Sequence, residues 1–531
     1  MANVNVLIGV GGTGAKIVES ALVSFFAGFG PEDVSVAFID QDGGNGNVAR
    51  SLQLLRSLER FRTLWWNDSR PDHIHPPAGE ASLGSVRARA LSAGDPLWSP
   101  HPADATLADI LHADAVSRED PQLRALMDTL FTPDASEQRM PLTVGYRGRS
   151  HIGSAAFLSG LNDEQPFWAA LNELIRRARG GTEVRVFLAG SVFGGTGAAG
   201  FPTLARRLRQ LAQATDGAKV RLGGALMLPY FGFNRPDDPG ANVARQEDLL
   251  LQSEEALRYY GELFEREGQV FDELYLAGWN PLFQLGYHSP GSRSQANPAL
   301  PPELIAATGA VRFFLNENEM PERRVFLSSR ADRDRLGWTD VPGPSDELSA
   351  LPYRRIGRLL RFCTAWRNTI RPALKKRLFG GDAWFRRQGA NKVSYDSPET
   401  KENLEALDRM VELVLQWAAG MQLFSVSTQF GPPGVRHFEL WDVSPQAVFP
   451  DPIGPEQISE PLRLRAPLPS DQAAAAYDRV LGGLGETRPA PQSDLFESLN
   501  EVVRPGEHGG LGRIVDAVFQ ASAVDRELEP A

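Results

Sequence analysis

The chain has 531 residues, a formal net charge of −11, and 42% hydrophobic and 23% charged residues. This length predicts roughly two to four domains, and the composition excludes a wholly disordered chain. The acidic balance gives no electrostatic reason to bind nucleic acid or an anionic membrane. The single cysteine, Cys363, excludes an intrachain disulfide framework and a multi-cysteine metal site.

The amino-terminal sequence lacks the basic and long apolar regions of a secretion signal, and no later stretch has the apolar length of a membrane span. A chain with one cysteine also suits a reducing compartment. We therefore expect a cytoplasmic protein that has no membrane span and no nucleic acid partner.

The first motif is an apolar strand, a glycine-rich turn and an apolar-periodic helix within Val4–Phe26. Gly9–Gly14 fits the G-x-G-x-x-G pattern of a nucleotide-binding strand, loop and helix. The next apolar run, Val34–Ile39, ends before Asp40 and Asp42, where a dinucleotide-binding fold carries the acid that binds ribose. Taken alone, this passage predicts a Rossmann-type unit.

From Ser51 to Met140 the periodicity loosens, and we interpret this region as an insertion. His73 and His75 have no cluster of metal ligands near them in sequence, which favours an exposed loop over half a metal site. After the insertion, Arg147–Ser150 forms a basic, glycine-containing turn before an apolar helix. That turn, with Arg149, is either a third phosphate contact or a solvated loop.

The strongest motif is an apolar strand that runs into a glycine-rich turn and a helix within 188–204. Glycines remove the side chains that would hold a backbone away from a phosphate, and a helix start presents unpaired N–H groups and a positive dipole end. One such loop could simply close a strand-to-helix connection. Two loops favour a phosphate site, for which we expect Gly194, Gly195, Thr196, Gly197 and Ala198, together with Gly11, Gly12, Thr13, Gly14 and Lys16.

Strands alternate with helices through the first 315 residues, which predicts an α/β fold with a parallel sheet covered on both faces. Ligands of open α/β sheets lie outside the carboxyl ends of the strands. The candidate residues at such ends are Gly11, Asp42, Gly194, Pro229 and Asn280.

The second half of the sequence divides into three further parts. Residues 316–345 connect the first domain to the second and begin with a charged segment, Asn316–Arg335. Residues 346–450 read as a smaller α+β domain with a helix over Pro398–Ala418 and an antiparallel hairpin within Leu423–Val448. Residues 451–531 are a Pro- and Gly-rich extension with a terminal helix over Leu511–Glu527.

Several of these motifs resemble those of the tubulin and FtsZ superfamily. Ala189–Gly200 is similar to its G-G-G-T-G-[ST]-G phosphate signature, with Phe193 in place of the first glycine and alanines at the last two positions. Gly9–Lys16 is similar to its first phosphate loop. Lys16 stands where FtsZ has an asparagine, so it would either contact phosphate or point into solvent.

The resemblance covers roughly Val4 to Leu315. Leu228–Phe233 resembles the loop that approaches the ribose, and Trp279–Pro281 the place where an asparagine reads the guanine edge. The resemblance implies that GTP or GDP is bound with Mg²⁺. The sequence contains no G-x-x-x-x-G-K-[ST], so a P-loop mechanism is unsupported.

The resemblance also implies hydrolysis at a subunit interface, where an acid of one subunit activates water at the nucleotide of the next. Asp340 is the best candidate for that acid, and an ordinary turn aspartate is the alternative. The preceding segment offers four other acids, Glu317, Glu319, Asp332 and Asp334. Turnover would then accompany head-to-tail association, which produces filaments if the contact does not close.

Three functions remain open at this point. The first is a tubulin-like GTPase that assembles with itself into filaments. The second is a GTP-binding switch or scaffold within a multiprotein bacterial system, for example a defence system, with proteins of the same operon as partners. The third is an NAD-dependent enzyme that uses the first glycine loop alone.

Overall fold

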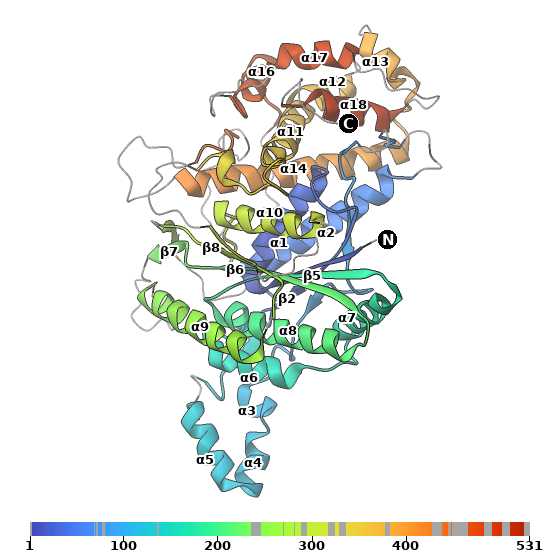
Figure 1. Cartoon of the computed structure of the whole chain (residues 1–531). Coiled ribbons are helices and arrows are strands. Elements are labelled where there is room, and N and C mark those ends of the chain that lie inside the picture. Colours follow the sequence, from blue (N-terminus) through green and yellow to red (C-terminus); the bar gives the residue numbers. More distant parts are fainter. Residues whose placement is uncertain are drawn as a thin grey trace.

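The computed structural model describes most of the chain as an α/β core joined to a layer of helices (Figure 1). The described residues are 3–67, 70, 73–76, 80–134, 137–234, 246–268, 270–280, 282–287, 295–316, 324–328, 336–376, 383–426, 438–443, 448, 466–482, 491–501 and 510–524.

The core is an eight-stranded sheet with the order β10-β8-β6-β5-β1-β2-β3, in which β4 also pairs with β2. Its pairings are parallel. The strands are β1 (Val4–Val10), β2 (Asp33–Ile39), β3 (Arg87–Ala90), β4 (Leu97–Trp98), β5 (Glu183–Ser191), β6 (Lys219–Met227), β8 (Glu273–Ala277) and β10 (Arg324–Ser328). The central strands are continuous apolar runs because both faces of the sheet are buried. The predicted Rossmann-type parallel sheet is confirmed.

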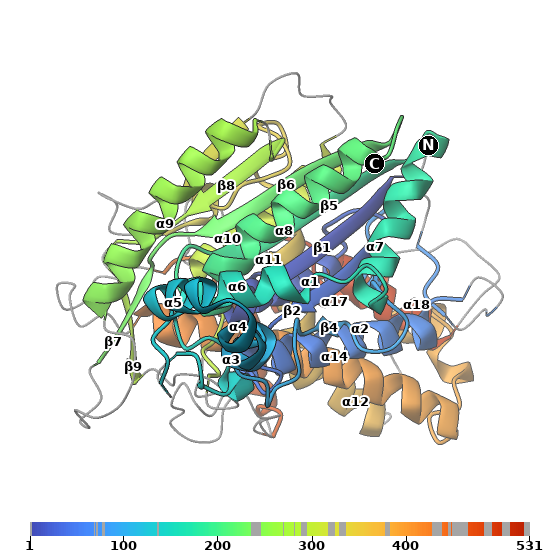
Figure 2. The same ribbon diagram turned by 90° about the horizontal axis from the view of Figure 1, so that it is seen from below.

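Helices cover the two faces of the sheet (Figures 1 and 2). One face carries α1 (Gly11–Phe26), α2 (Gly46–Trp65) and α10 (Pro301–Leu315). The other carries α6 (Ser150–Gly160), α7 (Pro166–Arg177), α8 (Gly195–Ala214) and α9 (Gln246–Glu267). Beyond the end of β6, a small parallel pair forms between β7 (Phe231–Asn234) and β9 (Phe283–Tyr287).

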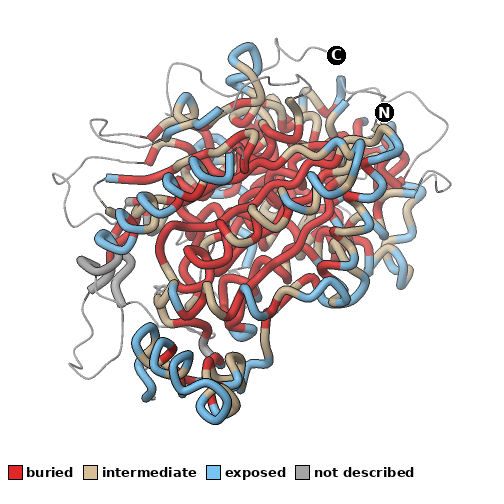
Figure 3. Tube along the Cα trace, turned by 60° about the horizontal axis from the view of Figure 1, so that its bottom comes forward, coloured by how far each residue is buried: buried red, intermediate tan, exposed pale blue. Residues whose placement is uncertain are grey.

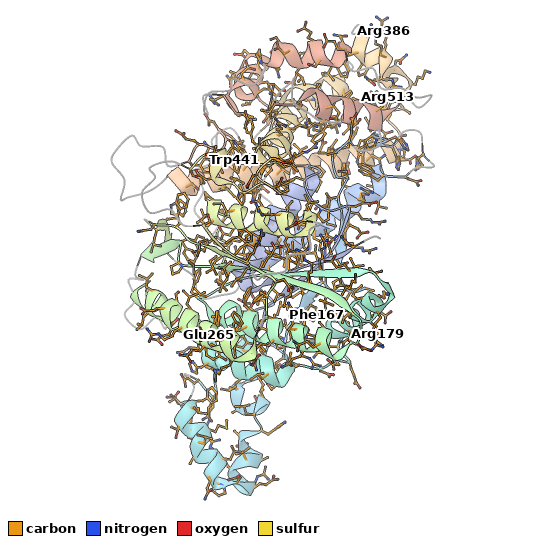
Figure 4. All side chains as sticks on the ribbon, viewed as in Figure 1. Phe167, Arg179, Glu265, Arg386, Trp441 and Arg513 are labelled. Atoms are coloured by element: carbon orange, nitrogen blue, oxygen red, sulfur yellow. The ribbon has the colours of Figure 1, made fainter. Side chains whose placement is uncertain are left out.

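The C-terminal helices form a third layer over α1, α2 and α10 (Figure 1). They are α11 (Leu351–Ala365), α12 (Arg371–Lys376), α13 (Ala383–Arg387), α14 (Pro398–Val426), α16 (Ser470–Arg479), α17 (Gln492–Glu501) and α18 (Leu511–Ala521). The indole N–H of Trp417 on α14 donates to Ser20 Oγ on α1 at 3.1 Å, so this layer shares a core with the sheet domain. Trp441, Arg386 and Arg513 lie in this layer in Figure 4, and Phe167 lies on the opposite side of the sheet.

The hairpin predicted within Leu423–Val448 is wrong in its first strand. Residues 423–426 are the last turn of α14, which runs past the expected end at Ala418. The alternation in this stretch fits one helical turn as well as a strand, and the packing of α14 against α2 and α11 decides for the helix. Residues 427–437 and 444–447 lie outside the described part.

The region expected as one insertion, 51–140, is divided in the structure. Its first part belongs to α2, and β3 and β4 join the main sheet. Only α3 (Leu107–Ile110), α4 (Ala113–Glu119) and α5 (Pro121–Leu130) project from the body, and much of this hairpin is exposed (Figure 3).

The neck of the projecting hairpin is closed by a bridge between Thr106 and Pro141 and by the Leu142 N–H, which donates to Ala105 O at 3.0 Å. Among the two histidines expected in an exposed loop, His75 is exposed and His73 is buried. None of the described helices combines the length and the apolar character that crossing a membrane requires.

Candidate functional site

The centre of the sheet contains a reversal of strand order. β1 lies between β2 and β5, and the chain leaves β1 through α1 on one face but leaves β5 through α8 on the other (Figure 2). Because the two connections diverge to opposite faces, this is the topological switch point at which open α/β sheets bind ligands. Both glycine-rich turns lie at the carboxyl edge of this point.

The two glycine turns are in direct contact. A Cβ on Gly11 would lie 3.2 Å from the backbone nitrogen of Gly197, and Gly11 has a φ of +72° that side chains disfavour. A Cβ on Gly14 would lie only 2.3 Å from the carbonyl oxygen of Ala189 in β5. Glycine is therefore needed here so that the start of α1 can pack against β5 and against the second turn.

Both helices begin without a side-chain cap. The residues that precede their first turns are Val10 and Gly194, and neither first turn contains an acid. Their first-turn N–H groups therefore donate to no side chain of the capping residue and add a positive dipole end to the site. No atom of the described residues lies within 4 Å of a Cβ built on Gly194. This arrangement is suited to an anion.

A buried carboxyl lies between the second glycine turn and the end of β2. Asp40 accepts hydrogen bonds from Thr196 Oγ1 at 2.8 Å, from Asn45 Nδ2 at 3.0 Å and from the Asp42 N–H at 3.2 Å. Burial raises the pKa of Asp40 from 3.8 to about 7, the Asp42 charge raises it too, and the hydrogen bonds oppose both. At neutral pH this group is therefore poised between its charged and neutral forms.

The turn after β2 packs against the first glycine turn. Asp42 is buried and accepts the Gly44 N–H at 3.0 Å. A Cβ on Gly12 would lie 2.9 Å from Asn45 Nδ2 and 3.3 Å from Asn47 Nδ2. Sequence reasoning missed these two asparagines, although an asparagine that follows glycines before a helix is a recognisable N-cap signal.

The basic turn expected as a third phosphate contact does lie at the site. The two residues before Arg147 contact the site. A Cβ on Gly145 would lie 3.5 Å from the Asp42 Cβ, and a Cβ on Gly195 would lie 2.6 Å from the Tyr146 Cβ. Arg147 has a φ of +48°, which is strained for a non-glycine residue. The buried Tyr146 hydroxyl and Arg147 Nε have no hydrogen-bond partner among the described residues.

Arg149, the arginine chosen from the sequence, precedes α6 and its Nη1 lies 3.6 Å from Met140 Sδ. Arg147 belongs to the same basic turn but was not chosen as a site residue, and the structure gives it a positive φ and a buried Nε without a partner among the described residues. Backbone strain and a buried unpaired nitrogen are the signals, and neither is visible in sequence.

Lys16 does not point into solvent, so that expectation is wrong. Its Nζ lies 2.6 Å from Glu303 Oε1 on α10 and 2.9 Å from the Tyr230 hydroxyl, and all three side chains are buried. A direct phosphate contact would require Lys16 to leave this pair.

Pro229 and Asn280 follow β6 and β8, so they lie at the same edge as the glycine turns. The Trp279 N–H donates to the Pro229 carbonyl oxygen at 3.4 Å, and Asn280 is exposed. From β2 to β8 the edge spans four strand spacings, about 19 Å. The structure thus brings the sequence-predicted candidates of five strands onto one edge.

Asp340 lies elsewhere, in a short turn of the C-terminal layer. Its Oδ2 accepts the N–H of Gly337 at 2.9 Å, and the neighbouring Trp338 donates its indole N–H to Leu440 O at 2.6 Å. The four alternative acids, Glu317, Glu319, Asp332 and Asp334, lie outside the described residues. No group of three or more His, Cys, Asp or Glu side chains suited to a metal is found in the described part of the chain.

The chain matches no family model, no curated protein and no solved structure. Its function is therefore argued from the geometry of this edge.

Proposed function

We propose that the protein binds a nucleoside triphosphate at the switch point, with its phosphates between the starts of α1 and α8. The observation that carries this proposal is the convergence of two uncapped helix starts that touch through Gly11 and Gly197. Backbone N–H groups from Gly11 to Ala15 and from Gly194 to Ala198 would hold the phosphate oxygens.

Side chains around the turns add to this site. The Thr13 hydroxyl is a donor within the first turn, the Thr196 hydroxyl fixes Asp40 beside the second turn, and Arg147 and Arg149 supply positive charge there. Mg²⁺ would take oxygen ligands from the phosphates, from water and from Asp42, which agrees with its usual coordination by several waters, one or two carboxylates and substrate phosphates. Asn280 and Pro229 would face the nucleoside.

The resemblance to tubulin and FtsZ selects guanine as the base and makes GTP the first candidate ligand. A dinucleotide is the weaker candidate, since Asp40, one of the two acids after β2, is tied to Thr196 and buried rather than free to bind a ribose. Calorimetric titration with GTP, ATP and NAD tests this choice. GTP should bind most tightly, and preferential binding of NAD would reject the assignment.

The binding assay has a matched pair of variants. Gly197→Ala places a Cβ 2.7 Å from Ser191 Oγ at the contact between the two turns and should weaken binding. Gly180→Ala adds the same group on the surface, where no atom of the described residues lies within 4 Å, and should bind like the parent protein.

We further propose that GTP is hydrolysed when copies associate head to tail, with Asp340 of one copy serving the nucleotide of the next. Turnover per molecule should then rise with protein concentration, and Asp340→Ala should remove that rise. Exposed Asp346, in the following loop, offers a control through Asp346→Ala.

A GTP-binding switch that does not assemble is the second candidate. The observation in its favour is the hydrogen bond that Asp340 Oδ2 accepts from the Gly337 N–H, which engages this carboxylate within its own turn. Bound nucleotide with no turnover at any concentration, and no effect of Asp340→Ala, would select the switch over the assembling GTPase.

A further inference from the structure

Two of the departures from the tubulin and FtsZ motifs, Lys16 and Phe193, meet at one buried residue, Tyr230. Tyr230 follows β6 and is fully buried. Lys16 Nζ donates to its hydroxyl at 2.9 Å, and the ring of Phe193 lies 5.9 Å from its ring, measured between centroids. Neither departure is an isolated substitution, because each supplies a neighbour to the same side chain.

Tyr230 also contacts the phosphate turn of α1 and the start of α10. Burial raises the pKa of Tyr230, and Thr13 in that turn opposes the rise. The Tyr230 hydroxyl donates to Glu303 Oε1. Glu303 in turn accepts the Leu300 N–H on Oε2 at 2.8 Å and so caps the first turn of α10. One phenol therefore joins the first glycine turn, the residue before the second glycine turn and the start of α10.

The electrostatics of this group favour a fixed arrangement. Lys16 and Glu303 are 2% and 0% exposed, and they neutralise each other at 2.6 Å. A buried pair of this kind is costly to break, because removal of one partner leaves an uncompensated charge. Phe193 and Phe231 pack around the Tyr230 ring, with centroid distances to it of 5.9 and 4.9 Å.

We propose that Tyr230, held by Lys16 and Glu303, is a positioning residue that couples the two glycine turns to the start of α10. In its ligand-dependent part this inference rests on the proposed nucleotide binding. A phosphate bound at the start of α1 attracts the positive charge of Lys16 on the same helix, and the hydrogen bonds of Tyr230 to Lys16 and Glu303 then readjust. Occupation of the site is thereby communicated to α10 and to the helical layer that packs on it.

The test is hydrogen–deuterium exchange of the full-length chain with Tyr230→Phe, which removes only the hydroxyl. Exchange should rise by about tenfold at 11–16 and at 300–306 together, since the link between them is cut. The matched control is Tyr275→Phe, because Tyr275 is also buried and donates to a buried glutamate, Glu273, at 2.8 Å on the other end of the sheet. It should leave both segments unchanged.

Added GTP supplies a second readout. In the parent protein GTP should protect both the glycine turns and 300–306, whereas in Tyr230→Phe it should protect the glycine turns alone and bind about tenfold more weakly. A double variant, Lys16→Met with Glu303→Gln, removes both charges at once, so no lone charge is buried. It should reproduce the loss of coupling.

The outcomes separate this inference from the proposed function. If GTP does not bind the parent protein, nucleotide binding is rejected, and the ligand-free exchange still decides the role of Tyr230. If 300–306 exchanges in ligand-free Tyr230→Phe as it does in the parent and in Tyr275→Phe, the coupling is overturned even when GTP binds.

Discussion

The two ends of the sheet differ in how their polar groups are satisfied. At the amino end, Arg221 Nη2 lies 2.9 Å from the buried Glu273 Oε1, and Arg185 Nη1 donates to the Phe314 carbonyl at the end of α10 at 2.7 Å. At the carboxyl end, two helix starts lack side-chain caps and Asp40 is buried with a pKa of about 7. The amino end is closed by its own ion pairs, whereas the carboxyl end keeps backbone donors available to a ligand beside its buried Lys16–Glu303 pair.

This contrast indicates that the amino end of the sheet serves folding stability and the carboxyl end serves ligand binding. Charges that pair within the chain add to folding stability, whereas strained or uncapped groups are retained where a ligand can complete them. Substitutions at the amino end should therefore change stability and leave binding intact, and those at the carboxyl end should change binding as well.

The largest expected effect is at the amino end. Glu273→Ala should lower the free energy of unfolding by about 3–5 kcal/mol, because it removes the nearer acid partner of Arg221 and the acceptor of the buried Tyr275 hydroxyl. Denaturant unfolding measures this loss, and GTP affinity should stay at the parent value. Glu265→Ala, an exposed position on α9 marked in Figure 4, is the control and should change stability by about 0.5 kcal/mol or less. If Glu273→Ala lost GTP binding but kept its stability, the proposed difference between the two ends of the sheet would be rejected.

The next effect is a pH dependence at the carboxyl end. The folded protein holds a proton on Asp40 between pH 3.8 and about 7, where the unfolded chain does not, so this group's contribution to stability falls as pH rises through that window. A shift of this size corresponds to something on the order of 4 kcal/mol. Unfolding of the parent and of Asp40→Asn should be compared from pH 4 to 8. Their difference should decline up to about pH 7 and then level off, and a flat difference would contradict the raised pKa.

A smaller effect is expected from Gly195→Ala. The added Cβ would lie 2.6 Å from the Tyr146 Cβ and push the 145–149 turn away from the second glycine turn. Overpacking of this kind costs about 1–3 kcal/mol, and GTP binding should weaken with it. Gly180→Ala again provides the control in thermal unfolding and titration. Unchanged binding would remove this turn from the site.

The smallest effect is expected from Thr196→Val, which deletes the hydroxyl that donates to Asp40 at 2.8 Å. One lost hydrogen bond should reduce stability by about 1 kcal/mol. Because this bond lowers the pKa of Asp40, the upper limit of the pH-dependent window should move to higher pH. A pH window that does not move would show that the Thr196 hydrogen bond does not lower the pKa of Asp40.

The fold and the position of the site followed from local patterns in the sequence. A strand, a glycine turn and a helix form one contiguous unit, so the runs before Gly11 and Gly194 predicted both turns and their common edge. The strand β10 was not predicted, because 324–328 is a short edge strand within a charged segment and shows no alternation of buried and exposed residues.

The contacts that shape the site could not be obtained from sequence, because they join distant residues. Thr196 and Asp40 are 156 positions apart, and Lys16 meets Glu303 only after α1 and α10 pack on the same face. For Lys16 an exposed side chain was one of two expectations, since a lysine is rarely fully buried unless it is paired. The pattern of α1 alone cannot reveal that Glu303 is the partner of Lys16.

The closed neck of the projecting hairpin makes that hairpin a detachable module. The chain leaves the body at Thr106 and returns at Pro141, and the bridge between them brings the two ends together without α3, α4 and α5. The largely exposed residues 113–130 of α4 and α5 can therefore be replaced by a short glycine linker, or by a fluorescent protein, at little energetic penalty to the sheet. Leu107 and Met140 stay in place because they are buried in the core. The same geometry offers a site for reporters at a distance from the switch point.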